Sequence, residues 1–177
     1  MISASKYGQA LFSLATEQGC TDSVLDDLRV VKDVLTNEPQ AMDLLGSPSV
    51  AANEKRDFVR QVFGQSEQIL VNTLLVLCDC GEINALPDIL QAYSDCYDKA
   101  NNICRIHMTT AVPVSDEQSG RLLVQLERTT GMSVVLEKSV DPDLIGGVVL
   151  DFPDRRIDSS IRTRLRAVQE TLTETIN

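Results

Sequence analysis

The stretch from Asp143 to Leu172 constrains the fold of this chain more than any other. Residues 144–152 form an apolar run with β-branched valines, which predicts a buried strand. A Gly146-Gly147 pair interrupts this run, and such a pair indicates a bulge or a close approach of two backbone segments. Residues 151–156 include a proline and two aspartates, the composition of a turn. The chain is therefore expected to end a strand here and to turn before its last element.

A helix is expected after this turn. Asp158 stands at the predicted N-cap, because its carboxylate can accept the free N–H groups of the first helical turn. Four apolar residues follow at helical spacing, namely Ile161, Leu165, Val168 and Leu172. The polar side of this predicted helix carries three arginines, Arg162, Arg164 and Arg166. A solvated helix face and a docking surface explain these arginines equally well.

The first hundred residues show helical periodicity throughout. Apolar residues recur at i, i+3, i+4, i+7 and i+8 from Tyr7, which predicts an amphipathic first helix that ends at Gly19. Further stripes, separated by Gly, Pro and capping residues, predict five more helices. The fifth, residues 66–80, has little polar surface beyond Asn72 and Thr73. Such a helix is central in a bundle or leaves one face for a partner.

The pattern changes after Asn101-Asn102. Residues 104–112 alternate between apolar and polar side chains, which predicts a half-buried strand. Ser115 and Gln118 have the spacing of a capping box that opens a helix. Residues 134–136 supply another short strand before the run described above. The second part of the chain is therefore expected to be a small α/β unit.

The expected fold class is α + α/β, with an N-terminal six-helix bundle over residues 1–101 and a small α/β domain over residues 102–177. The formal net charge is −10, and residues 1–100 hold 7 Lys and Arg against 15 Asp and Glu, a net of −8. Nucleic-acid phosphates need a basic surface, so nucleic acid is not an expected partner. A partner that contacts both domains would meet two different electrostatic fields.

Cysteine usage and apolar run lengths indicate the compartment. The five cysteines are odd in number and include no C-x-x-C pair, which argues against a disulfide framework and for a reducing compartment. The first residues lack the basic segment and the continuous apolar core of a signal peptide. No apolar run reaches the length of a membrane span. We therefore expect a cytoplasmic protein that does not insert into a membrane.

Candidate catalytic and metal-binding residues are few. His107, the one histidine, lies on the polar side of a predicted strand with no acid nearby in sequence, which favours a plain surface residue over a general base. Cys78 and Cys80 would lie about 200° apart around a helix, so they cannot chelate one metal ion. The Gly146-Gly147 pair belongs to no phosphate-binding motif. We expect no catalytic residue, no metal and no cofactor.

The run LIGGVVLDFPDRRIDSSIRTRL, residues 144–165, resembles the C-terminal signature of the delta subunit of F-type ATP synthases, a relative of the mitochondrial oligomycin-sensitivity-conferring protein. Ser159 and Thr163 stand where that signature usually has glycine. Near the N-terminus, YGQALFSLA resembles the family's YAxALxxLA opening. Gly81-Glu82-Ile83 resembles its G-R-L motif, with Glu82 in place of the usual arginine. The resemblance spans almost the whole chain.

The resemblance implies a non-catalytic stator subunit that links the catalytic head to the peripheral stalk, so that proton-driven rotation is coupled to ATP synthesis. In the family, the helical domain binds the N-terminal helix of an alpha subunit in a groove between the first and fifth helices. On this sequence that face comprises Tyr7, Ala10, Leu11, Leu14, Thr73, Val76 and Leu77. The implied docking surface for the b subunits of the stalk comprises Arg155, Arg156, Arg162, Arg164 and Arg166.

The resemblance also implies a peripheral position on the cytoplasmic face of a bacterial plasma membrane or of a thylakoid. Two alternatives stay open from the residues alone. A cytosolic helical adaptor or regulatory module with no role in ATP synthase is one, and from periodicity alone a simple bundle core is favoured over a groove for a partner. An enzyme that works through cysteines or carboxylates is the other, and it would need a deep pocket lined by groups of perturbed pKa.

Overall fold

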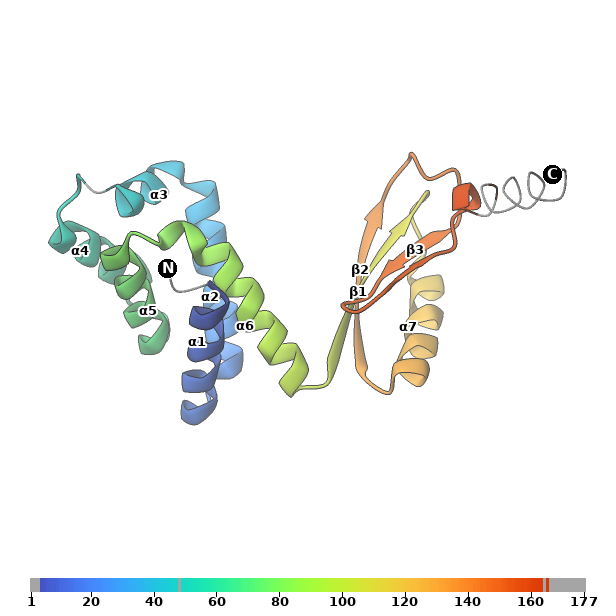
Figure 1. The fold of residues 1–177 in the computed structure, drawn as a ribbon, viewed down its shortest axis with the longest axis horizontal. Helices are drawn as coiled ribbons and strands as arrows, with labels where there is room; N and C mark the ends of the chain where they lie inside the picture. Colours follow the sequence, from blue (N-terminus) through green and yellow to red (C-terminus); the bar gives the residue numbers. More distant parts are fainter. Residues whose placement is uncertain (1–3, 48, 164, 166–177) are drawn as a thin grey trace, which may run out of the picture. The chain divides into compact units, whose positions relative to one another are not determined.

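The computed structural model describes residues 4–47, 49–163 and 165, and the chain divides into two compact units, Met1–Tyr97 and Asp98–Asn177. The first unit is helical, and the described part of the second contains a four-stranded sheet with one helix, α7 (Asp116–Thr130), packed on it (Figure 1). This arrangement confirms the expected α + α/β fold class.

The helical unit follows the predicted order of apolar stripes and breaking residues. Pro39 takes the first position of its helix, where the missing N–H has no intrahelical partner to lose. Gly81 ends the fifth helix in the left-handed region, with a φ of 70°. The elements are α1 (Ala4–Gln18), α2 (Thr21–Asn37), α3 (Pro39–Gly46), α4 (Ala52–Phe63), α5 (Gln68–Cys80), the 3-10 helix η1 (Ile83–Ala85) and α6 (Leu86–Ala100).

Every element of this unit contributes to a single apolar core. Tyr93 of α6 is fully buried in it, with its ring edge-on to Phe12 at a centroid distance of 5.5 Å. Burial raises the pKa of the Tyr93 hydroxyl, which therefore stays protonated and donates to the carbonyl oxygen of Thr21 at 2.9 Å. The core thus contains a polar group whose hydrogen-bonding capacity is satisfied.

Helix α1 packs very closely on α6 at Gly8. A Cβ atom at this position would lie 2.6 Å from the Cβ of Ala92 and 2.8 Å from the carbonyl oxygen of Ile89. Because no larger residue fits between the two helices without displacing one of them, Gly8 fixes the distance between α1 and α6. The side of α1 that carries Tyr7 is thereby held next to α5.

The second unit is built on a mixed sheet with strand order β2-β1-β3-β4. The pair β1–β2, at one edge of the sheet, is parallel and is joined through α7, which opens with the predicted capping box at Ser115 and Gln118. The other two strand pairs are antiparallel. The elements are β1 (Ile103–Thr110), α7 (Asp116–Thr130), β2 (Ser133–Val140), β3 (Val148–Asp151) and β4 (Arg156–Asp158).

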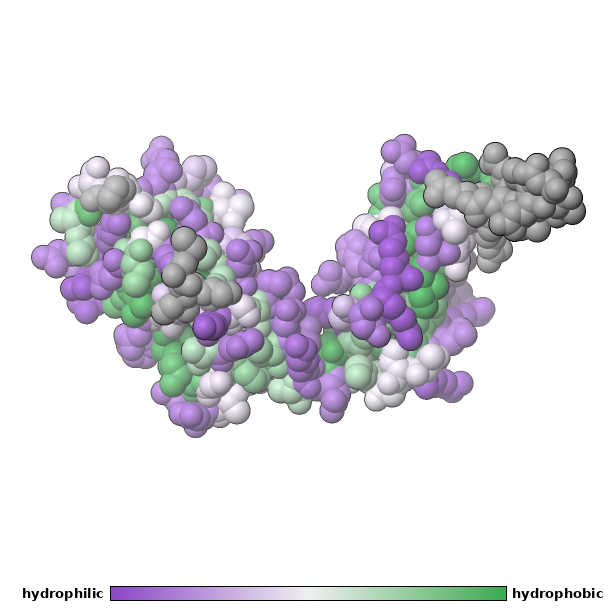
Figure 2. Space-filling model, in the orientation of Figure 1, coloured by the Kyte–Doolittle hydropathy of each residue, from purple (hydrophilic) through white to green (hydrophobic). Residues whose placement is uncertain are grey.

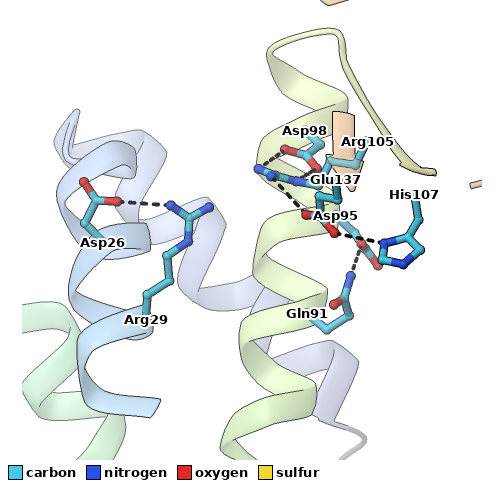
Figure 3. A network of polar contacts seen from close by, with 8 residues as sticks. All are labelled: Asp26, Arg29, Gln91, Asp95, Asp98, Arg105, His107 and Glu137. Carbon is cyan, nitrogen blue, oxygen red and sulfur yellow. Dashed lines mark hydrogen bonds and ion pairs between the residues drawn. The ribbon is translucent and has the colours of Figure 1, made fainter. Parts of the chain in front are cut away.

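The two faces of the sheet differ in polarity. The apolar face packs on α7, whereas the opposite face carries His107 in register with Glu137 on one side and Asp151 on the other. His107 Nδ1 lies 3.6 Å from Glu137 Oε2 (Figure 3). Arg105 on the same face binds Asp98 through two contacts of 2.6 and 3.1 Å. The fold therefore places acids beside His107 that are far from it in sequence.

The predicted strand over residues 144–152 is too long. Strand β3 begins at Val148, and the preceding glycines form a bend instead. Gly147 has a φ of 94°, and a Cβ atom there would lie 2.5 Å from the carbonyl oxygen of Ser159. The predicted close backbone approach is thus confirmed, and it brings the chain before β3 against the segment that follows β4.

The predicted N-cap at Asp158 is also wrong, because Asp158 ends the unpredicted strand β4 and the helix begins at Ile161. Ser160 is the N-cap: its Oγ accepts the N–H of Thr163 at 3.3 Å. The Asp158 carboxylate instead accepts the Ser160 N–H at 2.8 Å and the Thr163 hydroxyl at 2.9 Å. The hydrogen bonds from Ser160 and Thr163 lower the pKa of Asp158.

Candidate functional site

An apolar groove lies between α1 and α5 in the helical unit, with a volume of about 370 Å³. Each helix supplies residues at i, i+3, i+4 and i+7, so that two stripes face one another across the groove. Figure 2 shows apolar surface in this part of the unit. The lining residues are Tyr7, Ala10, Leu11, Leu14 and Gln18 from α1, and Ile69, Asn72, Thr73 and Val76 from α5.

The groove has a buried floor and exposed walls. Leu11 and Ile69 are buried and form part of the floor, whereas Leu14 and Val76 are 47 % and 48 % exposed. Thr73 donates its hydroxyl to the carbonyl oxygen of Ile69 at 2.8 Å, so its polar atom is already paired within α5. A partner can therefore cover these side chains without leaving the Thr73 hydroxyl without a hydrogen bond.

The end of the groove beside Tyr7 is polar. Burial raises the pKa of the Tyr7 hydroxyl, and the charge of Glu82 together with hydrogen bonds to Cys80 and Glu82 raises it further. Tyr7 therefore presents its ring to the groove while its hydroxyl interacts with the segment that follows α5.

Six of the seven residues expected at the alpha-subunit site line this groove, and Leu77 does not. Leu77 is fully buried, because it follows Leu70 and Leu74 at i+7 and i+3 on the core side of α5. Sequence reasoning missed Gln18, Ile69 and Asn72. The i, i+3, i+4, i+7 spacing that includes Val76 would have identified the two α5 residues.

The described arginines of the expected stalk-docking site each contact a different group. The Arg155 guanidinium lies over the ring of Phe152, 5.0 Å from its centroid. Arg156 Nε pairs with an oxygen of Asp151 at 3.3 Å. Arg162 donates to a backbone carbonyl oxygen at 3.0 Å. Each thus has a partner within its own unit.

The remaining C-terminal residues of the prediction lie outside the part of the chain that the structure describes. They are Arg164, Arg166, Val168 and Leu172.

A second hollow, of about 510 Å³, lies in the sheet unit beside the Gly146-Gly147 bend. Val112 and Ile145, at 67 % and 66 % exposed, are among its lining residues. The side chain of Ile161 lies against Gly146, and Leu165 is exposed one turn further along. Sequence reasoning missed this apolar surface, because it assigned Ile145 to a buried strand.

Two buried cysteines are poor nucleophiles. Burial raises the pKa of the Cys78 thiol, and it also raises the pKa of the Cys104 thiol. Both therefore stay protonated at neutral pH. Within residues 4–47, 49–163 and 165, no three His, Cys, Asp or Glu side chains gather in an arrangement that could hold a metal ion.

None of the described helices combines the length and the apolar character that a membrane span needs.

Known proteins match this chain over nearly its full length. The family described as "ATP synthase delta (OSCP) subunit" matches residues 4–172. The ATP synthase subunit delta of Lactobacillus gasseri is 32 % identical over 172 residues, which cover 97 % of this chain and 94 % of that protein. The corresponding subunit of Nostoc sp. is 34 % identical over 164 residues, which cover 92 % and 90 %.

A structural comparison gives the same fold. A chain of the Toxoplasma gondii mitochondrial ATP synthase hexamer superposes with a TM-score of 0.77 at 20 % identity, and 98 % of each chain is covered. Together, the family match, the curated relatives and the shared fold show that this chain belongs to the ATP synthase delta (OSCP) subunit family.

Proposed function

We propose that this chain is a non-catalytic stator subunit of an F-type ATP synthase, which links the catalytic head to the peripheral stalk. The helices of residues 1–101 would form a six-helix bundle that binds the N-terminal helix of an alpha subunit, and residues 102–177 would bind the b subunits. The observation that carries this proposal is the apolar groove between α1 and α5, in a chain whose family consists of ATP synthase subunits.

The groove suits a contact that must hold against torque. A surface ion pair contributes about 0–1 kcal/mol, whereas burial of a large apolar side chain contributes about 1.5–3 kcal/mol. Leu14 and Val76 stand half-exposed on opposite walls, and their remaining surface is available to a partner. An amphipathic helix with apolar residues at i, i+3, i+4 and i+7 matches such a groove.

The charge of this part of the chain is consistent with a basic partner. The net charge of residues 1–100 is −8, from 7 Lys and Arg against 15 Asp and Glu. An acidic surface accelerates the encounter with a basic helix and disfavours acidic ones. The apolar groove would then supply most of the affinity.

The stalk contact is better assigned to the apolar surface of the sheet unit than to its arginines. Val112, Ile145, Ile161 and Leu165 expose apolar area around and beyond the second hollow. Arg155, Arg156 and Arg162 each already contact a group of their own unit, whereas these apolar side chains keep uncovered area. We therefore propose that this apolar surface docks the b subunits.

Membership of the family favours this role over that of an unrelated cytosolic adaptor. In the proposed role the chain is peripheral to the membrane-bound complex, on the cytoplasmic face, and has no catalytic residues of its own. Proton flow and ATP chemistry would belong to other subunits.

Val76→Asp tests the proposal, with Val30→Asp as its matched control. Val30 on α2 is 58 % exposed and lies outside the groove, so both substitutions place a charge at an exposed valine of the helical unit. Val76→Asp should abolish binding of the purified chain to the catalytic head, measured by analytical ultracentrifugation, while Val30→Asp should bind like the native chain. Leu14→Asp should behave like Val76→Asp. Normal head binding and normal coupling of proton flow to ATP synthesis in Val76→Asp would contradict the proposal.

A further inference from the structure

The chain that follows β4 is fastened to the bend that precedes β3. The N–H of Ser159 donates to the carbonyl oxygen of Val148 at 3.0 Å, and the N–H of Ile161 donates to the carbonyl oxygen of Gly146 at 2.9 Å. The Cδ1 atom of Ile161 lies 2.7 Å from the place that a Cβ atom of Gly146 would take. The helix that begins at Ile161 therefore starts at a fixed place on the sheet unit.

Asp158 holds the first turn of this helix through its side chain. One carboxylate oxygen accepts the N–H of Ser160 at 2.8 Å, and the other accepts the hydroxyl of Thr163 at 2.9 Å. Ser160 is 2 % exposed, so loss of the Asp158 carboxylate would leave a buried N–H without its acceptor. Arg162 adds a second attachment by donating to the carbonyl oxygen of Asp143 at 3.0 Å.

The apolar docking surface of the sheet unit draws side chains from both attached segments. Ile145, 66 % exposed, belongs to the bend, whereas Ile161 and Leu165, 43 % and 58 % exposed, belong to the helix. Asp158 itself does not line the second hollow. Its effect on the surface therefore passes through the helix that it holds.

We propose that Asp158 is a positioning residue for the docking of the b subunits, because it holds Ile161 and Leu165 against the bend that carries Ile145 before a partner binds. This inference rests on the proposed function of the apolar surface. The apparent affinity for a partner falls in proportion to the fraction of molecules in which the binding surface is assembled. A chain that assembles the surface in advance thus avoids the cost of ordering it on binding.

Asp158→Ala and Asp158→Asn in the full chain form the test pair. Alanine removes both acceptor oxygens, whereas asparagine keeps a carbonyl oxygen that can accept the Ser160 N–H. Calorimetric titration with the soluble part of the same organism's b subunit should show about tenfold weaker binding by Asp158→Ala, because the surface is then assembled in about a tenth of the molecules. Asp158→Asn should bind nearly like the native chain. Asp154→Ala removes an exposed acid of the same unit outside the surface, and its native affinity should exclude an effect of overall charge.

Hydrogen exchange of the free chain separates positioning from the stability of the whole unit. In Asp158→Ala the N–H of Ile161, which is bonded to Gly146 in the native chain, should exchange at least tenfold faster. The N–H of Ile106, a fully buried residue of β1 between β2 and β3, should keep its protection. Asp158→Asn should restore slow exchange at Ile161. Equal loss of protection at Ile161 and Ile106 would show general destabilisation and overturn the positioning role.

Ile145→Asp tests the docking surface itself, with Val124→Asp as its matched control. Val124 is 47 % exposed on α7 and does not line the second hollow, so Val124→Asp should bind the b subunit like the native chain. Ile145→Asp should weaken binding. If it does, native affinity in Asp158→Ala, or equal losses in Asp158→Ala and Asp158→Asn, would overturn the role of Asp158. Native affinity in Ile145→Asp would instead overturn the proposed docking of b subunits on this surface.

Discussion

Replacement of Gly8 by alanine combines a stabilising gain in helix propensity with a destabilising steric overlap. In a helix interior, alanine is more favourable than glycine by about 1 kcal/mol. At Gly8, however, the added methyl group would lie 2.6 Å from the Ala92 Cβ, 2.8 Å from the Ile89 oxygen and 2.9 Å from the Tyr93 nitrogen. Two of these atoms are backbone and the third is a Cβ, so no side-chain rotation relieves the overlap.

Helix α1 would therefore have to move away from α6. Non-bonded atoms prefer about 3.5–4.0 Å, so a shift of roughly 1 Å is needed, and a gap of that size forfeits a quarter to a half of each contact across the interface. Overpacking of this kind costs about 1–3 kcal/mol. A rigid backbone contact favours the upper part of that range, about 2–3 kcal/mol. Subtracting the gain of about 1 kcal/mol in helix propensity leaves a net loss of about 1–2 kcal/mol for Gly8→Ala, or about 4–16 °C in Tm for a domain of this size.

Gly120→Ala is the matched control. Gly120 also lies inside a helix, α7, but a Cβ atom there would meet nothing within 4 Å. It should gain about 0.5–1 kcal/mol from helix propensity alone. Urea unfolding followed by circular dichroism measures both variants. A Gly8→Ala protein as stable as the native chain, beside a stabilised Gly120→Ala protein, would refute the close packing of α1 on α6.

Three further predictions concern other parts of the chain. Gly147→Ala should lower the thermal stability of the sheet unit by about 2 kcal/mol or more, because it combines a left-handed φ with a 2.5 Å approach to the Ser159 oxygen; unchanged calorimetric unfolding would contradict this. Hydrogen bonds lower the folded pKa of Asp158 below its unfolded value of roughly 3.9. The stabilisation they provide is present above that pH and lost as the pH falls through the folded pKa, so the stability of Asp158→Asn should depend less on acid pH than that of the native chain. A thiol-specific reagent should label exposed Cys80 in the native state well before Cys78, which is buried and has a raised pKa; equal labelling, measured by mass spectrometry, would contradict the burial.

Much of the fold follows from local pattern. The stripe from Tyr7 and the capping box at Ser115 involve residues within a few positions of each other, where backbone geometry alone determines the outcome. Strand β4 was not predicted and β3 was predicted too long, because three or four residues carry too little periodicity. Their pairing depends instead on the close approach at Gly147, a tertiary contact.

The candidate sites also contain some residues that the sequence predicts and others that it does not. The family resemblance implied seven residues for the groove, and six of them line it, because residues on one helix face stay together in any fold. Leu77 is the exception and is buried in the core, because the neighbouring helices determine which side of α5 faces the core. The arginines near residue 155 and the acids beside His107 depend on partners from other strands, such as Asp151 for Arg156, and sequence spacing carries no information about those.

Calorimetric titration of the full chain with the N-terminal helix of the same organism's alpha subunit tests the central claim most directly. The account predicts saturable binding with a clearly negative heat-capacity change, because an apolar groove is being filled. It also predicts that Val76→Asp weakens binding at least a hundredfold, about 2.7 kcal/mol, while Val30→Asp leaves it unchanged. No heat of binding to the folded native chain at high peptide concentration, or equal binding by the two variants, would contradict a helix-binding groove between α1 and α5.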